Sequence, residues 1–311
     1  MNFKVYSVEK FDLNDNEKAI FLSLLAVLSW STISTALKIA LEYITHFEMM
    51  LISCLTALIF FTLLLTVTHR WYLVGKLTVR HWVVLAAVGL VNPVAYYWTL
   101  FRAYELLPAQ VAQPINYAWP IVLLIFLAVF AHEPIQKRKY IGMFLSLIGV
   151  VLISLGAKNN SNLSISASGV IFGIMSAVLW ASYWMINNML KEKMDVCVAL
   201  FVTFLFGTLY LSLGTLFLDF SVSDMKGIIA GVYIGGFEMG IPFILFGVAL
   251  KKTTNHTLVN QLCYLSPFLS LFFISLVLGE HIIVTTYIGL VLIVSGLLFN
   301  QYCVNSNTKL K

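Results

Sequence analysis

YAWPIVLLIFLAVFAHEPIQKRKYIGMFLSLIG, residues 117–149, and YLSPFLSLFFISLVLGEHIIVTTYIGLVLIVSG, residues 264–296, are two versions of one pattern. Aligned without gaps, they share 11 identities in 33 positions. The shared residues include a proline, a glutamate and the triplet Tyr-Ile-Gly, which a common apolar composition does not explain. Nearer the start of each half, Trp30 and Trp180 occupy matching places. We therefore predict that the chain is an internal duplication.

The composition is typical of a membrane protein. Of the 311 residues, 60% are apolar and 11% are charged, and the mean hydropathy is +0.92. A soluble domain carries about 25% charged residues. This difference excludes a cytosolic enzyme, a nucleic-acid-binding protein and a secreted disulfide-rich scaffold. The four cysteines show neither CxxC spacing nor a cluster with histidines, so we predict that they are packing residues and that there is no metal site.

Ten apolar runs are long enough to cross a bilayer as helices. They cover residues 19–41, 47–68, 82–103, 108–131, 140–156, 169–190, 196–218, 228–250, 257–278 and 284–301. The first half, 19–156, and the second half, 169–301, hold five runs each, with an external linker at 157–168 between them. Because five is an odd number, the second half enters the membrane from the opposite side. The predicted fold class is therefore an all-α membrane protein of ten transmembrane helices in two inverted five-helix repeats.

The basic residues predict the orientation of these helices. With the N-terminus inside, 15 of the 19 Lys and Arg residues fall on inner segments, three fall outside, and Lys38 lies within the first run. Such an inner excess is what the positive-inside rule describes. We expect an integral protein of the plasma membrane, bacterial inner membrane by preference, with cytoplasmic tails at 1–18 and 302–311.

Polar and aromatic side chains recur every three or four residues along one face of five predicted helices. These stripes are Trp30, Ser34 and Lys38; Asn92, Tyr96 and Thr99; Gln113, Asn116, Tyr117 and Pro120; Trp180, Tyr183, Trp184 and Asn187; and Asn260, Tyr264 and Pro267. Polar groups at membrane depth usually face protein or water. The stripes, without Lys38, Thr99 and the prolines, are therefore predicted to line a central substrate-binding cavity. The alternative is that the rings form interfacial belts and the amides join helices.

Glu238 is the strongest single candidate for a functional residue within the membrane. It lies near the middle of the eighth run, after Gly235 and Gly236 and before Pro242. A carboxylate near the membrane midplane is by default a functional residue. We predict that Glu238 binds substrate and is the candidate for proton coupling. The alternative is a structural hydrogen bond to a neighbouring helix.

Prolines and glutamates occupy repeated positions in the two halves. Prolines within helices permit kinks, so the candidate gating or hinge residues are Pro93, Pro120, Pro242 and Pro267, static bends being the alternative. Glu133 and Glu280 lie at loop starts, and we predict that each organises a turn or caps the next helix.

The ten runs, the segments LSWS (28–31) and VLWAS (178–182), and the repeated Pro-x12-Glu pattern resemble the EamA-type members of the drug/metabolite transporter superfamily. The resemblance covers about residues 18–300. It implies a secondary transporter with alternating access, by preference an exporter of a small metabolite such as an amino acid. A multidrug or quaternary-cation exporter is the alternative within transporters.

Motifs for catalysis are absent from the sequence, which has no Walker-type glycine loop, GxSxG or HExxH. We therefore predict neither enzyme activity nor a cofactor. An intramembrane enzyme or a non-transporting membrane scaffold is the alternative from another class. The predicted partners are the lipid bilayer, a small-molecule substrate and protons, without nucleic acid, and the protein is expected to be a monomer or a homodimer.

Overall fold

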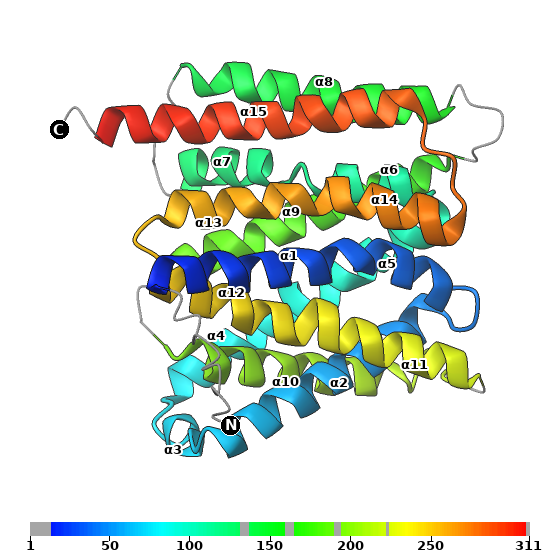
Figure 1. Ribbon diagram of the computed structural model, residues 1–311. Helices are drawn as coiled ribbons and strands as arrows, with labels where there is room; N and C mark the ends of the chain where they lie inside the picture. The colour runs from blue at the N-terminus through cyan, green and yellow to red at the C-terminus, as the bar shows by residue number, and fades with distance from the viewer. Residues whose placement is uncertain (1–13, 131–136, 159–164, 190–193, 222–223, 309–311) are drawn as a thin grey trace, which may run out of the picture.

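The computed structural model describes residues 14–130, 137–158, 165–189, 194–221 and 224–308, and these ranges form a bundle of helices (Figure 1). The helices are α1 (Asp15–Ala40), α2 (His46–Val67), α3 (Trp71–Val74), α4 (Val79–Gly89), α5 (Tyr96–Leu106), α6 (Ala109–Asn116), α7 (Trp119–Phe130), α8 (Lys139–Lys158), α9 (Ala167–Met189), α10 (Val196–Gly214), α11 (Met225–Ile234), α12 (Ile241–Lys252), α13 (His256–Leu262), α14 (Ser266–Leu278) and α15 (Val284–Thr308). Two π-helical segments, η1 (Leu90–Ala95) and η2 (Gly235–Gly240), and a 3₁₀ turn, η3 (Cys263–Leu265), join some of them.

Nine helical stretches in the described ranges are long and apolar enough to cross a membrane. They are Asp15–Ala40, His46–Val67, Val79–Leu106, Ala109–Phe130, Lys139–Gly156, Ala167–Ile186, Val196–Gly214, Met225–Lys252 and Leu258–Leu278. A further, shorter apolar stretch, Val284–Asn300, lies in α15. Each predicted apolar run overlaps one of these stretches. In Figure 1 α1 begins and α15 ends on the same side of the bundle, which we name the α1-start end.

Helix starts follow local capping chemistry. The side chains of Asn14 and Thr45 each accept a hydrogen bond from the backbone N–H three residues on. The carboxylates of Glu17 and Glu48 in turn accept one from the backbone N–H of the capping residue. This reciprocal arrangement satisfies backbone N–H groups that have no partner within the helix. It explains why α1 and α2 begin at the polar residues that border the apolar runs.

Four of the spanning stretches are interrupted near their middle, and these four contain the predicted hinge prolines. In η1 the backbone of Asn92 is extended, with φ −141° and ψ 119°, immediately before Pro93. In η2 the chain passes through Gly235 and Gly236 before α12 begins, with Pro242 in its first turn. The stretches 109–130 and 258–278 are divided between α6 and α7 and between α13 and α14.

Helices α8 and α15 lie side by side along one edge of the bundle and touch through glycines (Figure 1). A Cβ atom at Gly142 would lie 2.4 Å from the carbonyl oxygen of Gly296, and one at Gly149 would lie 2.4 Å from that of Gly289. Such distances leave no room for a side chain at these positions. The two backbones therefore approach closely, as small residues permit between membrane helices.

A second pair of glycines holds the interrupted stretches against their neighbours. A Cβ at Gly89 would lie 2.9 Å from the carbonyl oxygen of Thr203 in α10. A Cβ at Gly235 would lie 2.5 Å from that of Ser53 in α2. These two interrupted stretches, 79–106 and 225–252, therefore each pack directly on the backbone of a helix from the other half of the chain.

Candidate functional site

A cavity of about 850 Å³ lies between the two halves of the bundle. Its walls come from α1, α4 to α10, η2, α12, α13 and α15, with Tyr117 and Cys263 at two of the helix junctions. This volume is within the range of small-molecule sites. The lining extends to Lys139, Met194 and Asn300, which lie toward the α1-start end of the bundle.

Most of the predicted binding residues line this cavity. They are Trp30, Ser34, Tyr96, Gln113, Asn116, Tyr117, Trp180, Tyr183, Trp184, Glu238, Asn260 and Tyr264. Of the predicted hinge residues, Pro120 lines the cavity, whereas Pro93, Pro242 and Pro267 do not. For Asn187 the backbone belongs to α9, and its side chain lies outside the described part of the chain.

Asn92 departs from the predicted stripe. It is fully buried and does not line the cavity, although Tyr96 does. The stripe assumed one continuous helix from Asn92 to Tyr96, but the extended backbone at Asn92 breaks the helical register between them. A polar side chain at membrane depth therefore lies within the protein here, away from the cavity.

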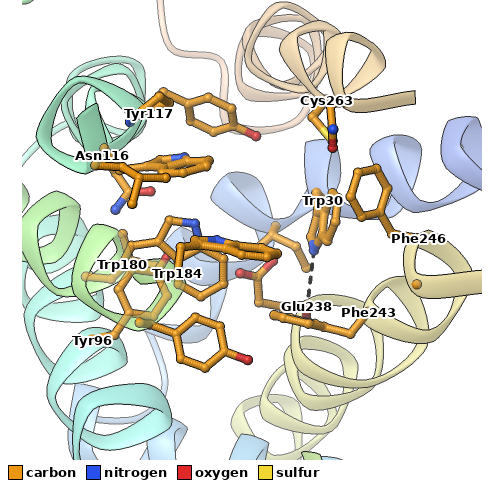
Figure 2. A pocket seen from close by; sticks show the side chains of 18 of the residues that line it. Trp30, Tyr96, Asn116, Tyr117, Trp180, Trp184, Glu238, Phe243, Phe246 and Cys263 are labelled. Carbon is orange, nitrogen blue, oxygen red and sulfur yellow. Dashed lines mark hydrogen bonds between the residues drawn. The ribbon is translucent and has the colours of Figure 1, made fainter. Parts of the chain in front are cut away.

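The repeated tryptophans meet on Phe243. Its ring centroid lies 6.2 Å from that of Trp30 and 6.1 Å from that of Trp180, in edge-to-face contacts. Trp180 also stacks on Tyr96, with 4.5 Å between the ring centroids. Phe246 also packs on Trp30, with 5.6 Å between the ring centroids. Figure 2 shows these rings as the walls of the cavity on both sides of Glu238.

Glu238 is positioned by helix α1. Pro242 has no backbone N–H, so the carbonyl of Glu238, four residues earlier, lacks an α-helical donor, and α1 supplies donors to two carbonyls of η2. Ser29 Oγ donates to the carbonyl oxygen of Phe237 at 2.6 Å, and Trp30 Nε1 donates to that of Glu238 at 3.4 Å. From the described residues, the carboxylate itself accepts one hydrogen bond, from Tyr97 Oη at 3.3 Å. In the described part of the chain Glu238 has no ion-pair partner.

The opposite end of the bundle is joined by Glu280 and Gln110. Glu280 accepts hydrogen bonds from the backbone N–H groups of Ala109 and Gln110, at 3.1 Å and 3.4 Å. The buried Gln110 side chain also donates to Glu280 and to the carbonyl of His281, and accepts from the N–H of Ile283. Glu280 therefore caps α6 in the other half of the chain, whereas the sequence predicts that it organises a local turn or caps the next helix. Glu133 lies outside the described residues.

Several lining residues escaped the sequence pattern, and they are Tyr104, Trp119, Lys139, Thr203, Phe243, Phe246 and Asn300. Phe243 and Phe246 follow the interruption at η2, so the face they occupy does not continue the register of α11. Tyr104 could have been found, because it continues the stripe of Tyr96 two turns further along α5. Its hydroxyl lies 2.7 Å from Ser34 Oγ.

Comparison with known proteins agrees with this architecture. Two regions of the chain, residues 17–155 and 167–301, match the EamA-like transporter family. The chain belongs to this family. It is therefore an integral membrane protein and a transporter, with two copies of the family's domain.

Among relatives, an uncharacterized transporter of Clostridium kluyveri is 29% identical over 194 residues, which cover 60% of this chain and 61% of that protein. The uncharacterized transporter YvbV of Bacillus subtilis is 25% identical over 225 residues, 70% of each chain. A solved crystal structure of a protein superposes with a TM-score of 0.66 at 20% identity, covering 90% of this chain and 95% of the other. That likeness concerns the fold alone.

Proposed function

We propose that this transporter is a secondary exporter of a small amphipathic metabolite, such as an amino acid, and that the cavity around Phe243 is its substrate site. The main support is that Trp30 and Trp180, at matching places in the two halves, meet on one ring in a cavity of about 850 Å³. Aromatic walls with a few polar groups suit an amphipathic molecule. Because the sequence has no nucleotide-binding motif, transport is driven by ion or substrate gradients.

The two halves are inverted five-helix repeats in this proposal. Gly142 matches Gly289 in the duplicated sequence, and Gly149 matches Gly296. Gly142 packs on Gly296 and Gly149 packs on Gly289, so exchanging the halves converts one contact into the other. A two-fold axis between α8 and α15 would produce this reciprocal pairing.

Alternating access would occur by movement of one repeat against the other around the cavity. The cavity lining extends toward the α1-start end, whereas Glu280 and Gln110 join the two halves at the opposite end. The excess of Lys and Arg on the α1 side makes that end cytoplasmic. The structure then corresponds to an inward-facing state, with Pro93, Pro120, Pro242 and Pro267 at or near the interruptions that would bend.

Glu238 is the proposed proton-coupling residue. It lacks an ion-pair partner in the described part of the chain, and it lines the cavity that substrate would enter. A carboxylate in this position can carry a proton in one direction while substrate moves in the other. The protein would act in the plasma membrane, with both termini in the cytoplasm, as a monomer or a homodimer.

Comparative metabolite export tests this function. Cells that produce the wild-type protein, Trp30→Ala, Trp180→Ala or the double variant are compared by mass spectrometry of medium and cytosol. We expect at least one amphipathic metabolite to accumulate in the medium with the wild-type protein, and this accumulation to fall in each variant at equal membrane abundance. Loss of the cavity walls is the physical reason, because removal of either ring opens the site around Phe243.

Trp71→Ala is the matched control, because Trp71 lies in the short helix α3 and does not line the cavity. Its export should equal that of the wild-type protein. If production of the wild-type protein changed the metabolite content of neither medium nor cytosol, transport through this chain would be contradicted. Depletion of a metabolite from the medium would reverse the proposed direction.

A further inference from the structure

Charge is distributed unevenly along the cavity. Among the described lining residues, Glu238 is the one acidic side chain and Lys139 is the one basic side chain. Glu238 lies midway along the stretch Met225–Lys252, whereas Lys139 is the first residue of α8, at the α1-start end. The centre of the cavity therefore carries a carboxylate, and the one cation among the described lining residues belongs to the end that we propose is the cytoplasmic mouth.

The carboxylate of Glu238 is incompletely partnered. One hydrogen bond, from Tyr97 Oη at 3.3 Å, reaches it, and the described residues offer it no ion pair. An ionised carboxylate removed from bulk water is costly unless a cation or several donors stabilise it. Since Glu238 lines an accessible cavity, a positively charged group on a substrate can supply the missing partner.

Aromatic rings surround the same point. Figure 2 shows Glu238 between Trp30 on one side and Trp180 and Trp184 on the other, with Phe243 close by. Contacts with neighbouring rings hold these walls, including Trp180 stacked on Tyr96 and Trp30 packed edge-on against Phe243. Ring faces carry negative electrostatic potential and attract ammonium groups, most strongly where water is excluded.

We infer that the cavity selects organic cations, with an ammonium head at Glu238 and an apolar body along Trp30, Trp180 and Phe243. This inference rests on the proposed function and narrows its substrate from amphipathic metabolites in general to amines of net positive charge, which places zwitterionic amino acids second to cationic amines. A carboxylate on the substrate would lie near Glu238 and would meet no basic side chain at that depth among the described lining residues. Zwitterions and anions therefore bind more weakly than cations.

Four probes with one phenyl ring and different charge test the inference. They are 2-phenylethylammonium, the zwitterion phenylalanine, the neutral 2-phenylethanol and the anion 3-phenylpropionate. Binding to the purified full-length protein in detergent is measured by titration calorimetry and by quenching of tryptophan fluorescence. We expect the ammonium to bind about tenfold or more tightly than the alcohol, with phenylalanine between them and the anion weakest.

Two variants separate charge from fold. Glu238→Gln should bring the affinities for the ammonium and the alcohol to within about twofold of each other, because a neutral amide offers no ion pair. Glu42→Gln, the same chemical change at an exposed turn outside the cavity, should leave all four affinities unchanged. If Glu238→Gln is poorly folded, Phe243→Leu keeps an apolar wall but removes a ring face, and it should weaken the ammonium more than the alcohol.

Equal binding of all four probes, tighter binding of phenylalanine or the anion, or no binding of any probe would overturn the cation inference. None of these binding results would contradict the proposed export, because the export experiment identifies transported metabolites without a chosen probe. Conversely, cation binding without any change in the metabolite content of medium or cytosol would support the cation site and contradict transport.

Discussion

Glu280 accepts hydrogen bonds from both the backbone and the side-chain amide of Gln110, at 3.4 Å and 3.3 Å. The two residues are 170 positions apart in the chain and belong to different halves. Gln110 is fully buried at this contact. Any movement that separates the halves at this end of the bundle must break these bonds.

Replacing Glu280 with alanine should therefore favour opening at the proposed outer end. Hydrogen bonds to a charged group contribute about 1.5–3 kcal/mol each, so the open population should rise about tenfold or more. The measurement is the rate at which a membrane-impermeant maleimide labels Leu37→Cys from outside, in a protein without its native cysteines. Leu37 lines the cavity and is buried in this state.

Glu105→Ala is the control for that experiment. Glu105 lies at the same end and pairs with His46 and Arg102, both in the first half, so its loss does not release one half from the other. Labelling that rises equally in both variants, or in neither, would contradict a specific role for the Glu280 contact.

The orientation of the bundle has its own test. Ser168 and Lys251 are both exposed, and they lie at opposite ends of the bundle. With single cysteines at these sites, we expect Ser168→Cys to react with the impermeant maleimide in intact cells and Lys251→Cys to react only after permeabilisation. Reaction of both from outside would end the proposed topology.

Proton coupling predicts a distinct behaviour for Glu238→Gln. A neutral amide of the same shape cannot release a proton, so the variant should exchange substrate across proteoliposome membranes yet fail to concentrate it in response to a pH gradient. The substrate used is the metabolite found by the export comparison, with Glu42→Gln as the matched control. Gradient-driven accumulation equal to that of the wild-type protein would remove Glu238 from coupling.

The glycine contact between α8 and α15 should be sensitive to a single methyl group. At Gly142 a Cβ would lie 2.3 Å from Asn300 Oδ1 and 2.4 Å from the carbonyl oxygen of Gly296. Gly142→Ala should lower the free energy of unfolding by about 1–3 kcal/mol, because the helices must move apart. The midpoint of thermal unfolding in detergent reports the change.

Gly247→Ala provides the comparison, because the nearest atom to its new Cβ would be 3.9 Å away in Val196. Removal of a helical glycine there should be neutral or stabilising by up to about 1 kcal/mol. Equal midpoints for Gly142→Ala and Gly247→Ala would show that the observed approach of α8 and α15 is looser than these distances imply.

Helical periodicity was sufficient to predict the parts of the cavity that lie on continuous helices. Trp180, Tyr183 and Trp184 lie on α9, and all three reach the cavity. The helical membrane class could also be read from composition, and the family followed from the resemblance of the repeated Pro-x12-Glu pattern and the LSWS and VLWAS segments to EamA-type transporters. These features depend on local spacing and on overall apolar content, which a sequence displays directly.

The parts of the site that the sequence did not predict depend on helix interruptions and on contacts between the two halves, which residue spacing does not reveal. At Asn92 and before Phe243 the helix is interrupted, so the angular position of the next residue is set by the interruption. Glu280 finds its partner Gln110 through the packing of the two halves. No local pattern predicts a contact of that range, although the identity of Glu280 suggested a capping role.

The hydrogen bond from Trp30 reaches the main-chain carbonyl of Glu238, while the carboxylate is contacted by Tyr97. The ring wall and the charged group are thus anchored through different atoms of one residue. A designer could therefore exchange the side chain at this position while the indole keeps its anchor. The charge preference of the site can therefore be changed without changing its aromatic rings. Substitution of Glu238 by a basic residue offers a route to a carrier for organic anions that keeps the same aromatic cavity.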